Sequence, residues 1–355
     1  MIFIYNWRDK KHRRSGGSET YIFNIIKYIN DKILFFTSKD KNLNNFEEYN
    51  NIKIFRFGID YLPILISLFS LFKLFKYRPK IIIENINHIP FFIPYKKIVI
   101  VHHLSGKQAL YEYPFLSIFV WFFEYIIFPL FYRNKIIITV SESTKELLKK
   151  LGFERVYVIH NGINRKNIII DKKENAIVYL GRIMKYKRIE HIILSFYLVK
   201  KKVKDAKLYI IGREKNKKYL NKLKELVNKL KLKDVYFLGY VDENKKEEIL
   251  KKSKVIVMTS VVEGWGIGII EGNSYGCVSI GYNVRGLKDS IKNNYSGFLV
   301  ENNNIKELSN KIIELLENEE LFNKMSKNSI EYSKNFDWDK SARKFEKILK
   351  LLTNI

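Results

Sequence analysis

The sequence of 355 residues contains a single cysteine, Cys277. One thiol cannot form a disulfide framework, and it cannot supply a cysteine-rich zinc site. The sequence also lacks internal repeats of the period found in solenoid proteins. At ~150 residues per domain, a chain of this length is too long for one ordinary hydrophobic core and is expected to form about two domains.

Long apolar runs are scarce. The one exception, residues 113–132, reads YPFLSIFVWFFEYIIFPLFY and has the length of a membrane span of about 20 residues. Glu124 lies inside this run and Pro129 interrupts it, so we expect a buried or surface-docked helix. Amphipathic contact with a bilayer face is the alternative, since Trp121 and clustered phenylalanines suit an interface. Residues 1–5 are too few for a signal-peptide core and lack a basic leader, so they are predicted to form the first strand.

Acidic residues are outnumbered, because 37 Asp and Glu face 64 Lys and Arg and leave a net charge of +27. Such an excess indicates a polyanionic partner, which includes nucleic acid, an anionic membrane surface or a phosphate-bearing substrate. Residues 1–170 have a net charge of 26 − 13 = +13, and residues 171–355 have 38 − 24 = +14. The even spread argues against a disordered basic arm. A hydrophobic content of 46% is enough for sizeable cores and excludes disorder as the main state.

Short β-rich runs alternate with segments of helical period along the whole chain, which predicts an α/β fold of βα units with parallel sheets. The predicted strands are 1–5, 33–37, 52–57, 80–84, 97–101, 135–140, 156–159, 176–180, 207–211, 235–238, 255–258, 278–280 and 297–300. The polar, turn-forming stretch 161–174 is the best linker candidate. We therefore expect two doubly wound, Rossmann-like domains that face each other across a cleft, with ligands at the carboxyl ends of the strands.

The segment 259–271 is the richest in chemical groups. A strand runs into a glycine-rich turn with Gly266 and Gly268, and a helix starts near Ile267. Glycines allow a ligand to approach the backbone, and free N–H groups at a helix start favour an anion. Glu263 and Glu271 could reach two parts of one ligand. Taken alone, the pattern fits a tight turn with two solvated acids better.

Three further segments follow predicted strands. Arg182 and Lys187 could clamp a diphosphate, since a guanidinium grips phosphate oxygens in pairs and an ammonium adds a point charge. Residues 15–19 (SGGSE) open a helix but lack a full G-x-G-x-x-G pattern and a Walker lysine. His102 could bind a substrate hydroxyl or transfer a proton, or it could simply cap a strand end. Adjacent His102 and His103 point opposite ways on a strand, so a zinc site is excluded there.

The sequence Asp337-Trp338-Asp339 is similar to a metal-binding Asp-x-Asp motif. It stands at the start of the last amphipathic helix, predicted over 338–352. Asp is a good capping or first-turn residue, so we interpret the motif as a helix cap.

These segments, in this order, resemble glycosyltransferase family 4, the retaining enzymes of the GT-B fold, over nearly the whole chain. The ordered set is specific, and its strongest part is Glu-Gly-x-Gly-x4-Glu from Glu263 to Glu271. The other matching segments are Gly16 to Glu19, His102, Val140 to Ser143, Asn161 to Asn164, Gly181 with Arg182 and Lys187, and Phe237 to Tyr240.

The resemblance implies a role for each matched residue. Arg182 and Lys187 would bind the donor diphosphate and stabilise its charge as it leaves. Glu263 would hold the donor sugar, Glu271 the ribose, and His102 the sugar near the reacting centre. The remaining donor-binding residues implied are Gly16 and Gly17 for the phosphates, Gly212, Arg213, Tyr240 and Val241 near the base, and Gly266, Ile267 and Gly268 in the turn. No metal and no other cofactor is expected, because the basic pair takes a metal's place.

Three positions depart from the family's pattern. Cys277 follows Gly276 where proline is frequent, and we expect only a backbone effect. Arg188 replaces a glycine after Lys187 and could add a phosphate or acceptor contact. Arg285 stands where a second glycine is common, so tight phosphate approach there is not expected.

The resemblance also suggests a division of labour. Residues 1–165 would form the acceptor-side domain, with helix 338–355 packed back onto it, and residues 166–337 would bind the nucleotide sugar. The donor would be a UDP- or GDP-sugar, and retention is usually ascribed to same-face attack in which a donor phosphate oxygen takes the acceptor's proton. The apolar stretches 61–75 and 113–132 and the basic surface suggest a lipid-linked or membrane-proximal glycan acceptor. The location expected is the cytoplasm or the inner face of the cell membrane.

Two other functions fit parts of the sequence. A nucleic-acid-binding protein would explain the net charge of +27 but not the ordered motifs. A GT-B phosphorylase would need a lysine that carries pyridoxal phosphate and usually a much longer chain, and neither is evident.

Overall fold

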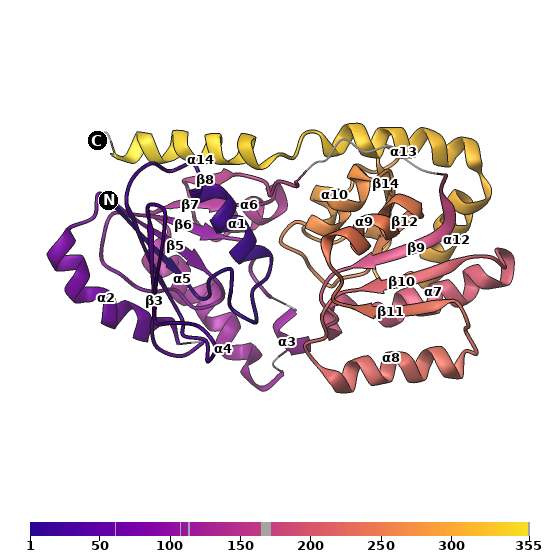
Figure 1. Cartoon of the computed structure of the whole chain (residues 1–355), viewed down its shortest axis with the longest axis horizontal. Coiled ribbons are helices and arrows are strands. Elements are labelled where there is room, and N and C mark those ends of the chain that lie inside the picture. Colours follow the sequence, from indigo (N-terminus) through magenta and orange to yellow (C-terminus); the bar gives the residue numbers. More distant parts are fainter. Residues whose placement is uncertain (61, 107, 113, 165–171, 354–355) are drawn as a thin grey trace. The chain divides into compact units, whose positions relative to one another are not determined.

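The computed structural model describes the chain except residues 61, 107, 113, 165–171 and 354–355. The chain forms two compact units (Figure 1). Unit 1 consists of residues 1–162 and 337–355, and unit 2 of residues 163–336. The expected boundary between residues 165 and 166 lies outside the described residues.

Unit 1 is built on a sheet of eight strands in the order β3-β4-β2-β1-β5-β6-β7-β8. All neighbours are parallel except β3 and β4. The strands are β1 (Ile2–Asn6), β2 (Ile33–Thr37), β3 (Phe46–Tyr49), β4 (Ile52–Arg56), β5 (Ile81–Ile86), β6 (Lys97–Val101), β7 (Ile136–Thr139) and β8 (Val156–Val158). The sequence predicted each of them except β3, a short and mostly exposed edge strand.

Helices cover both faces of this sheet. They are α1 (Gly17–Ile26), α2 (Pro63–Tyr77), α3 (Gln108–Glu112), η1 (Pro114–Leu116), α4 (Ser117–Phe122), η2 (Phe123–Ile127), α5 (Phe128–Tyr132), α6 (Glu142–Lys150) and α14 (Trp338–Thr353). When parallel strands are joined by right-handed crossovers, the direction in which the chain moves along the sheet decides which face the connecting helix covers. Accordingly, α1 and α14 lie on one side, and α2 and α4 lie on the other (Figure 1).

Unit 2 has a parallel sheet of six strands in the order β11-β10-β9-β12-β13-β14. The strands, all predicted, are β9 (Glu174–Leu180), β10 (Lys207–Ile211), β11 (Val235–Gly239), β12 (Ser253–Met258), β13 (Val278–Tyr282) and β14 (Gly297–Val300). The helical elements are η3 (Lys185–Lys187), α7 (Ile189–Lys202), α8 (Lys217–Lys229), α9 (Glu243–Lys252), α10 (Ile267–Ser274), α11 (Leu287–Ser290), α12 (Ile305–Glu317) and α13 (Glu319–Ser333). Neighbouring residues on β9 serve opposite cores, because Ile177 and Val178 belong to different buried clusters.

The last helix, α14, belongs to unit 1. The Trp338 ring meets the Tyr21 ring of α1 edge-on at a centroid distance of 6.0 Å. Gly162 permits this contact, since a Cβ there would lie 2.3 Å from the backbone nitrogen of Trp338. Asp337 Oδ1 accepts the backbone N–H of Asp339 at 2.6 Å. This hydrogen bond confirms the interpretation of the Asp-Trp-Asp motif as a helix cap.

The apolar run, described by the structure over 114–132, lies at the surface. Pro114–Tyr132 is long and apolar enough to cross a membrane, yet only 17% of it is buried. Of the two forms expected, the buried helix is wrong and the surface-docked helix is confirmed, whereas contact with a bilayer stays a prediction. Phe115 is 93% exposed. The inward contacts come from Glu124, Phe128 and Tyr132, which are all buried.

Candidate active site

The strand order of unit 2 reverses between β9 and β12, since the chain moves toward β11 before the linker to β12 and toward β14 after it. In open parallel sheets, ligands bind at such a reversal, outside the carboxyl ends of the strands. The turn after β9 contains Gly181, Arg182 and Lys187, and the turn after β12 contains Glu263. The fold therefore brings two of the predicted motifs to one edge of the sheet.

Lys187 and Glu263 form an ion pair between these two turns. Their side chains are 9% and 11% exposed. Burial by itself would lower the pKa of Lys187, but the Glu263 carboxylate outweighs it and the pKa is raised. Lys187 is thus held as an ammonium. The sequence predicted both residues but not their pairing.

Glu263 keeps one carboxylate oxygen available. Lys187 Nζ and Ser260 Oγ both donate to Oε1. Within the described part of the chain, Oε2 has no hydrogen-bond partner. The backbone N–H of Glu263 donates to Arg285 O at 3.0 Å, which fixes the turn. One oxygen therefore orients the side chain, and the other can accept a hydrogen bond from a ligand hydroxyl.

Arg188 does not face a ligand, in contrast to the contact considered from the sequence. It is 4% exposed. Its guanidinium donates to Thr259 O and Ser260 O, both at 2.7 Å, and to the side chains of Asn302 and Asn303. With its hydrogen bonds committed in this way, Arg188 ties the turn after β9 to the turn after β12.

The start of α10 completes this edge. Gly266 has φ +88°, a left-handed conformation that favours glycine, and no side chain caps the helix. A Cβ at Gly268 would lie 2.7 Å from Leu180 O, so glycine allows α10 to start against the end of β9. Backbone N–H groups around Ile267 thus lie where an anion can bind.

Glu271 is paired with a residue that sequence reasoning missed. Lys246 Nζ, from α9, lies 2.5 Å from Glu271 Oε1. Burial raises the pKa of Glu271, although the Lys246 charge opposes the shift. Lys246 is one of several lysines in a Lys/Glu-rich helix, so the sequence offers no signal that would single it out.

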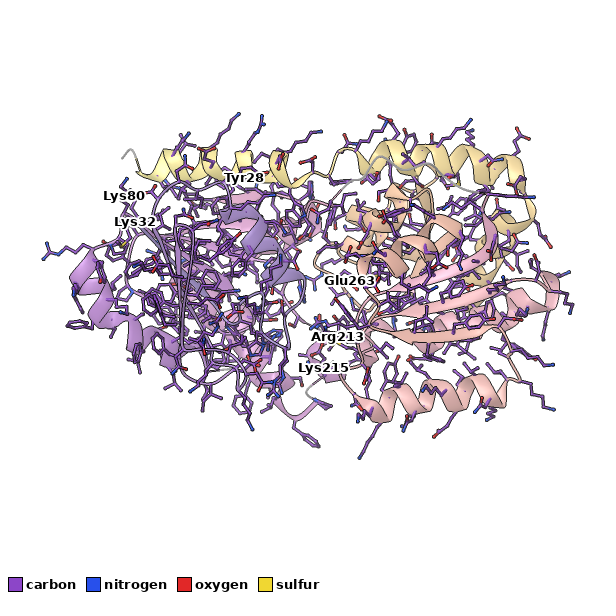
Figure 2. The ribbon with its side chains drawn as sticks, viewed as in Figure 1. Tyr28, Lys32, Lys80, Arg213, Lys215 and Glu263 are labelled. Carbon is purple, nitrogen blue, oxygen red and sulfur yellow. The ribbon has the colours of Figure 1, made fainter. Side chains whose placement is uncertain are left out.

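Arg213 and Tyr240 lie together, as the resemblance suggested. The Arg213 guanidinium stacks over the Tyr240 ring at 4.2 Å, and that tyrosine is 68% exposed. Gly212 serves backbone packing, because a Cβ there would lie 1.9 Å from Gly181 O. Val241 packs partly buried against the unit 2 core. Figure 2 shows Arg213, Lys215 and Glu263 along the same edge of unit 2.

In unit 1, Gly16 and Gly17 stand at the start of α1. Glu19 accepts the backbone N–H of Gly16 at 2.8 Å and is itself buried. Burial raises the pKa of Glu19, although the nearby Arg8 charge and the Gly16 hydrogen bond oppose the shift. Glu19 therefore caps the turn. Gly17 is exposed, so its backbone can be approached.

His102 is buried after β6, and its imidazole does not take up a proton near neutral pH. Burial lowers its pKa to about 3, with the neighbouring His103 adding to the effect. The imidazole is therefore neutral at physiological pH, and Nε2 lies 2.9 Å from Asn85 Oδ1. Asn85 in turn donates to Asn6 Oδ1 at 2.8 Å. The proton-transfer interpretation is not supported, whereas a hydrogen-bonding role fits.

Among the described residues, no group of three or more His, Cys, Asp or Glu side chains could hold a metal ion. Cys277 is buried, and its Sγ lies 3.2 Å from Leu250 O.

Sequence comparison identifies the class of protein. The family model described as "Glycosyltransferase Family 4" matches residues 15–167, and the model described as "Glycosyl transferases group 1" matches residues 161–332. The chain belongs to the family 4 glycosyltransferases of the GT-B fold.

Individual relatives agree with this assignment. The chain is 24% identical over 380 residues to the glycosyltransferase MJ1069 of Methanocaldococcus jannaschii, with 96% of each chain covered. It is 28% identical over 221 residues to MJ1178 of the same organism, covering 61% of this chain and 60% of that one. It is 28% identical over 190 residues to poly(ribitol-phosphate) alpha-N-acetylglucosaminyltransferase of Staphylococcus aureus, covering 53% of this chain and 38% of that one.

A solved structure shares the fold over the whole length. Anabaena HepE in complex with UDP and glucose matches with a TM-score of 0.78 at 18% identity, covering 98% of this chain and 99% of that one. At this identity, the likeness establishes the GT-B fold alone.

Proposed function

We propose that this glycosyltransferase moves a sugar, with retention of configuration, from a UDP- or GDP-sugar to a glycan or lipid-linked acceptor. The product would belong to a cell-surface polysaccharide, glycolipid or glycoprotein. The observation that carries the proposal is the Lys187–Glu263 pair at the strand reversal of unit 2. HepE, which shares the fold, binds UDP and glucose, and this supports a nucleotide-sugar donor.

Each member of the pair would contact a different part of the donor. Lys187, held as an ammonium, and Arg182 would bind the diphosphate and stabilise the negative charge that grows as it leaves. Glu263 Oε2 would accept a hydrogen bond from a hydroxyl of the transferred sugar. Because Glu263 Oε1 is already fixed by Lys187 and Ser260, the carboxylate needs little reorganisation when the donor binds.

The other donor contacts extend from this pair. Backbone N–H groups at Ile267 and Gly268 would bind phosphate oxygens, and Glu271 would accept from the ribose. Arg213 and Tyr240 form a flat cationic surface suited to a base. Gly16, Gly17 and His102 of unit 1 are proposed as phosphate and sugar contacts.

The chemistry we propose needs no metal and no other cofactor. The acceptor hydroxyl would attack the face from which the diphosphate departs, and a donor phosphate oxygen would take its proton. The glycosidic bond to the diphosphate breaks, the bond to the acceptor oxygen forms, and a nucleoside diphosphate is released. Full activity in excess EDTA, together with an unchanged anomeric configuration by proton NMR, would support this mechanism. Loss of activity in EDTA, or inversion, would contradict it.

A donor screen tests the function. The chain is incubated with UDP-glucose, UDP-N-acetylglucosamine, UDP-galactose and GDP-mannose, and both the thermal midpoint and the release of nucleoside diphosphate are measured. One donor should raise the midpoint, since a ligand that binds only the folded state stabilises it. Release of sugar 1-phosphate in phosphate buffer would instead indicate a phosphorylase, and retention on RNA with a steep salt dependence would indicate a nucleic-acid-binding protein.

Glu263→Gln sharpens the screen. The amide cannot form the ion pair with Lys187, so we expect turnover to fall by about 100-fold or more. Lys185→Ala is the control, because Lys185 is an exposed lysine two residues from Lys187 in the turn after β9. Turnover of Glu263→Gln near that of the control would show that the proposed site is wrong.

We also propose that unit 1 contacts an anionic membrane from the cytoplasmic side. Exposed apolar side chains gather on α2 and on 114–132. Phe72 and Phe75 of α2 are each 74% exposed, and Phe119 of α4 is 60% exposed. Such a surface is unusual on a soluble monomer and is typical of an interaction site.

The two apolar helical segments lie on the same face of the unit 1 sheet. Both join strands while the chain moves in the same direction along the sheet, and right-handed crossovers therefore place them on one side. The segment 91–92 connects them, because Ser67 of α2 donates to Phe91 O at 2.7 Å and Phe92 N–H donates to Tyr132 OH at 2.9 Å. The basic residues Lys73, Lys76, Arg78, Lys80, Arg133 and Lys135 stand on or next to these segments. Aromatic groups beside basic ones suit a surface of anionic lipid.

A further inference from the structure

His88 lies at the strand reversal of unit 1. The chain first moves from β1 toward β4 and then from β5 toward β8, so the reversal falls between β1 and β5. His88 follows β5, and Trp7 follows β1. The two rings meet edge-on at a centroid distance of 6.1 Å. His88 thus occupies the edge at which open parallel sheets bind ligands.

The backbone at His88 is held in an uncommon conformation. Its φ is +65°, in the left-handed region, and Ile89 N–H donates to Asn87 O at 2.8 Å across it. Non-glycine residues in this region cost energy and cluster at functional sites. The conformation directs attention to His88 but does not identify a ligand.

Glu124 provides the second observation. It is the one acidic residue in the run 113–132 and is 1% exposed. Its Oε1 lies 3.0 Å from His88 Nδ1, and its Oε2 accepts the backbone N–H of Gly106 at 3.3 Å. Glu124 lies in η2, a π-helical stretch between α4 and α5. Such stretches are rare and frequently occur at functional sites.

The position of the proton follows from these contacts. Burial alone would raise the pKa of Glu124, but its hydrogen-bonded and electrostatic contact with His88, together with the backbone N–H groups of Ser105 and Gly106, lowers it, so the side chain is a carboxylate. A carboxylate only accepts, and therefore His88 Nδ1 carries a hydrogen and donates. Ser105 Oγ, 2.7 Å from Nδ1, shares it. The Nδ1–H tautomer leaves a lone pair on Nε2.

That nitrogen is available. Across the described ranges, Nε2 of His88 has no hydrogen-bond partner, and the side chain is 27% exposed. The buried pair of Lys97 and Glu84 differs, because the 4% exposed Lys97 donates to Glu84 Oε1 and Tyr132 OH donates to Oε2 at 2.8 Å. The Lys97–Glu84 pair is enclosed, whereas the His88–Glu124 pair presents an acceptor atom at the ligand edge.

We infer that His88 Nε2 accepts a hydrogen bond from a hydroxyl of the sugar acceptor, with Glu124 as the positioning residue that holds the imidazole. The inference rests on the proposed function, since it needs an acceptor. It adds an acceptor contact in unit 1 to the donor contacts in unit 2. Glu124 stands on the helical segment whose outer side is the proposed membrane surface. A hydroxyl at His88 is therefore expected to belong to a glycan with a lipid anchor.

Steady-state kinetics test this inference. Octyl glucoside, octyl galactoside and octyl N-acetylglucosaminide, in vesicles of phosphatidylglycerol and phosphatidylcholine, serve as acceptor probes with the donor chosen by the screen. Donor hydrolysis without acceptor is measured in parallel. His88→Asn is the variant of choice, because asparagine tolerates a positive φ. We expect its KM for the best octyl glycoside to rise about tenfold, with donor KM and donor hydrolysis unchanged within about twofold.

Glu124 variants separate positioning from stability. Glu124→Gln should raise the same acceptor KM, and Glu124→Asp should restore part of the affinity, because a carboxylate again fixes the imidazole. Glu84→Gln is the matched buried-carboxylate control and should lower the thermal midpoint while leaving the acceptor KM unchanged. Nitrogen-15 NMR of labelled histidine should show the Nδ1–H tautomer of His88 in the wild type and its loss in Glu124→Gln.

The outcomes are distinguishable. An unchanged acceptor KM in His88→Asn would overturn the inference and leave the proposed function intact. Donor hydrolysis by the wild type without transfer to any of the three octyl glycosides would do the same, because the contact requires only a sugar hydroxyl. Absence of donor binding, hydrolysis and transfer in the wild type would overturn the proposed function itself.

Discussion

Arg188 is the residue that joins the two turns of the candidate donor site. Its guanidinium donates to two backbone carbonyls and two asparagine side chains, a fork geometry that lysine cannot reproduce. We predict that Arg188→Lys lowers the free energy of unfolding by about 2–4 kcal/mol, because buried carbonyl groups lose their partners. Urea denaturation followed by circular dichroism measures this change. Lys185→Ala, at an exposed site, should stay within about 0.5 kcal/mol of the wild type.

His102 links the stability of unit 1 to pH. Its pKa is about 3 in the folded chain because the imidazole is buried, whereas an exposed histidine has a pKa of about 6.5. Between these values the unfolded chain binds a proton that the folded chain does not, so stability contributed by neutral His102 is lost as the pH falls below about 6.5. The slope approaches about 1.4 kcal/mol per pH unit.

His102→Gln tests this linkage. Glutamine can still donate a hydrogen bond toward Asn85 but does not titrate, so the loss of stability between pH 7 and pH 4 should be smaller than in the wild type. Urea midpoints across that range provide the measurement. Equal slopes in both proteins would show that His102 is not the titrating group.

Residue-scale features of the site were only partly predictable. Each motif stands next to a strand in the sequence, which is why Arg182, Lys187, Glu263 and His102 could be selected. Their partners could not, because the Lys187–Glu263 pair spans 76 positions and depends on the strand order β9-β12. Arg188 was misjudged for the same reason, since burial by distant carbonyls leaves no local signal.

At the scale of elements, helices and strands with a regular hydrophobic pattern could be predicted from the sequence. Strands of unit 2 are apolar runs bounded by turns, and all six were predicted. Strand β3 (Phe46–Tyr49) was missed because it is an edge strand of only four residues, three of them exposed and two of them glutamates. The π-helical turn at Glu124 could not be predicted either. A single carboxylate in an apolar helix gives no sign in the sequence that it is buried against His88.

The apolar face of α2 and 114–132 predicts binding to anionic membranes. The wild-type chain should sediment with vesicles that contain phosphatidylglycerol. Added salt should weaken the binding, because it screens the basic residues. Phe72→Ser with Phe115→Ser should reduce the bound fraction without loss of folding, since both side chains are exposed. Leu351→Ser, at a 66% exposed leucine of α14, is the control. A wild-type chain that remains in the supernatant at low salt would contradict the proposal.

At the scale of the whole molecule, the net charge of +27 is divided between two units with separate cores. Arg182 and Lys187, in the turn after β9, are two of the basic residues in unit 2. Several helical lysines are paired with nearby glutamates, which is typical of a solvated surface and adds nothing to the net charge. The family match accounts for the ordered motifs, which a nucleic-acid partner would leave unexplained.

The last helix, α14, can be used to test whether the two units unfold separately. Residues 337–355 return to unit 1 after unit 2 is complete, and Trp338 is 4% exposed against Tyr21. Because each unit has its own core, we expect calorimetry to resolve two unfolding transitions. Trp338→Ala should lower the free energy of unfolding of unit 1 alone, by about 3–5 kcal/mol, because it leaves a large cavity.

The reciprocal substitution identifies the transitions. Ile312 is fully buried in unit 2. Ile312→Ala should therefore lower the free energy of unfolding of unit 2 by about 2–5 kcal/mol, and with it the midpoint of that unit's transition. The nucleoside diphosphate found in the donor screen should raise the transition that Ile312→Ala lowers, because the Lys187–Glu263 pair belongs to unit 2. A single transition shifted equally by both substitutions would mean that the two units unfold as one cooperative body, and α14 would then stabilise the donor site as well as unit 1.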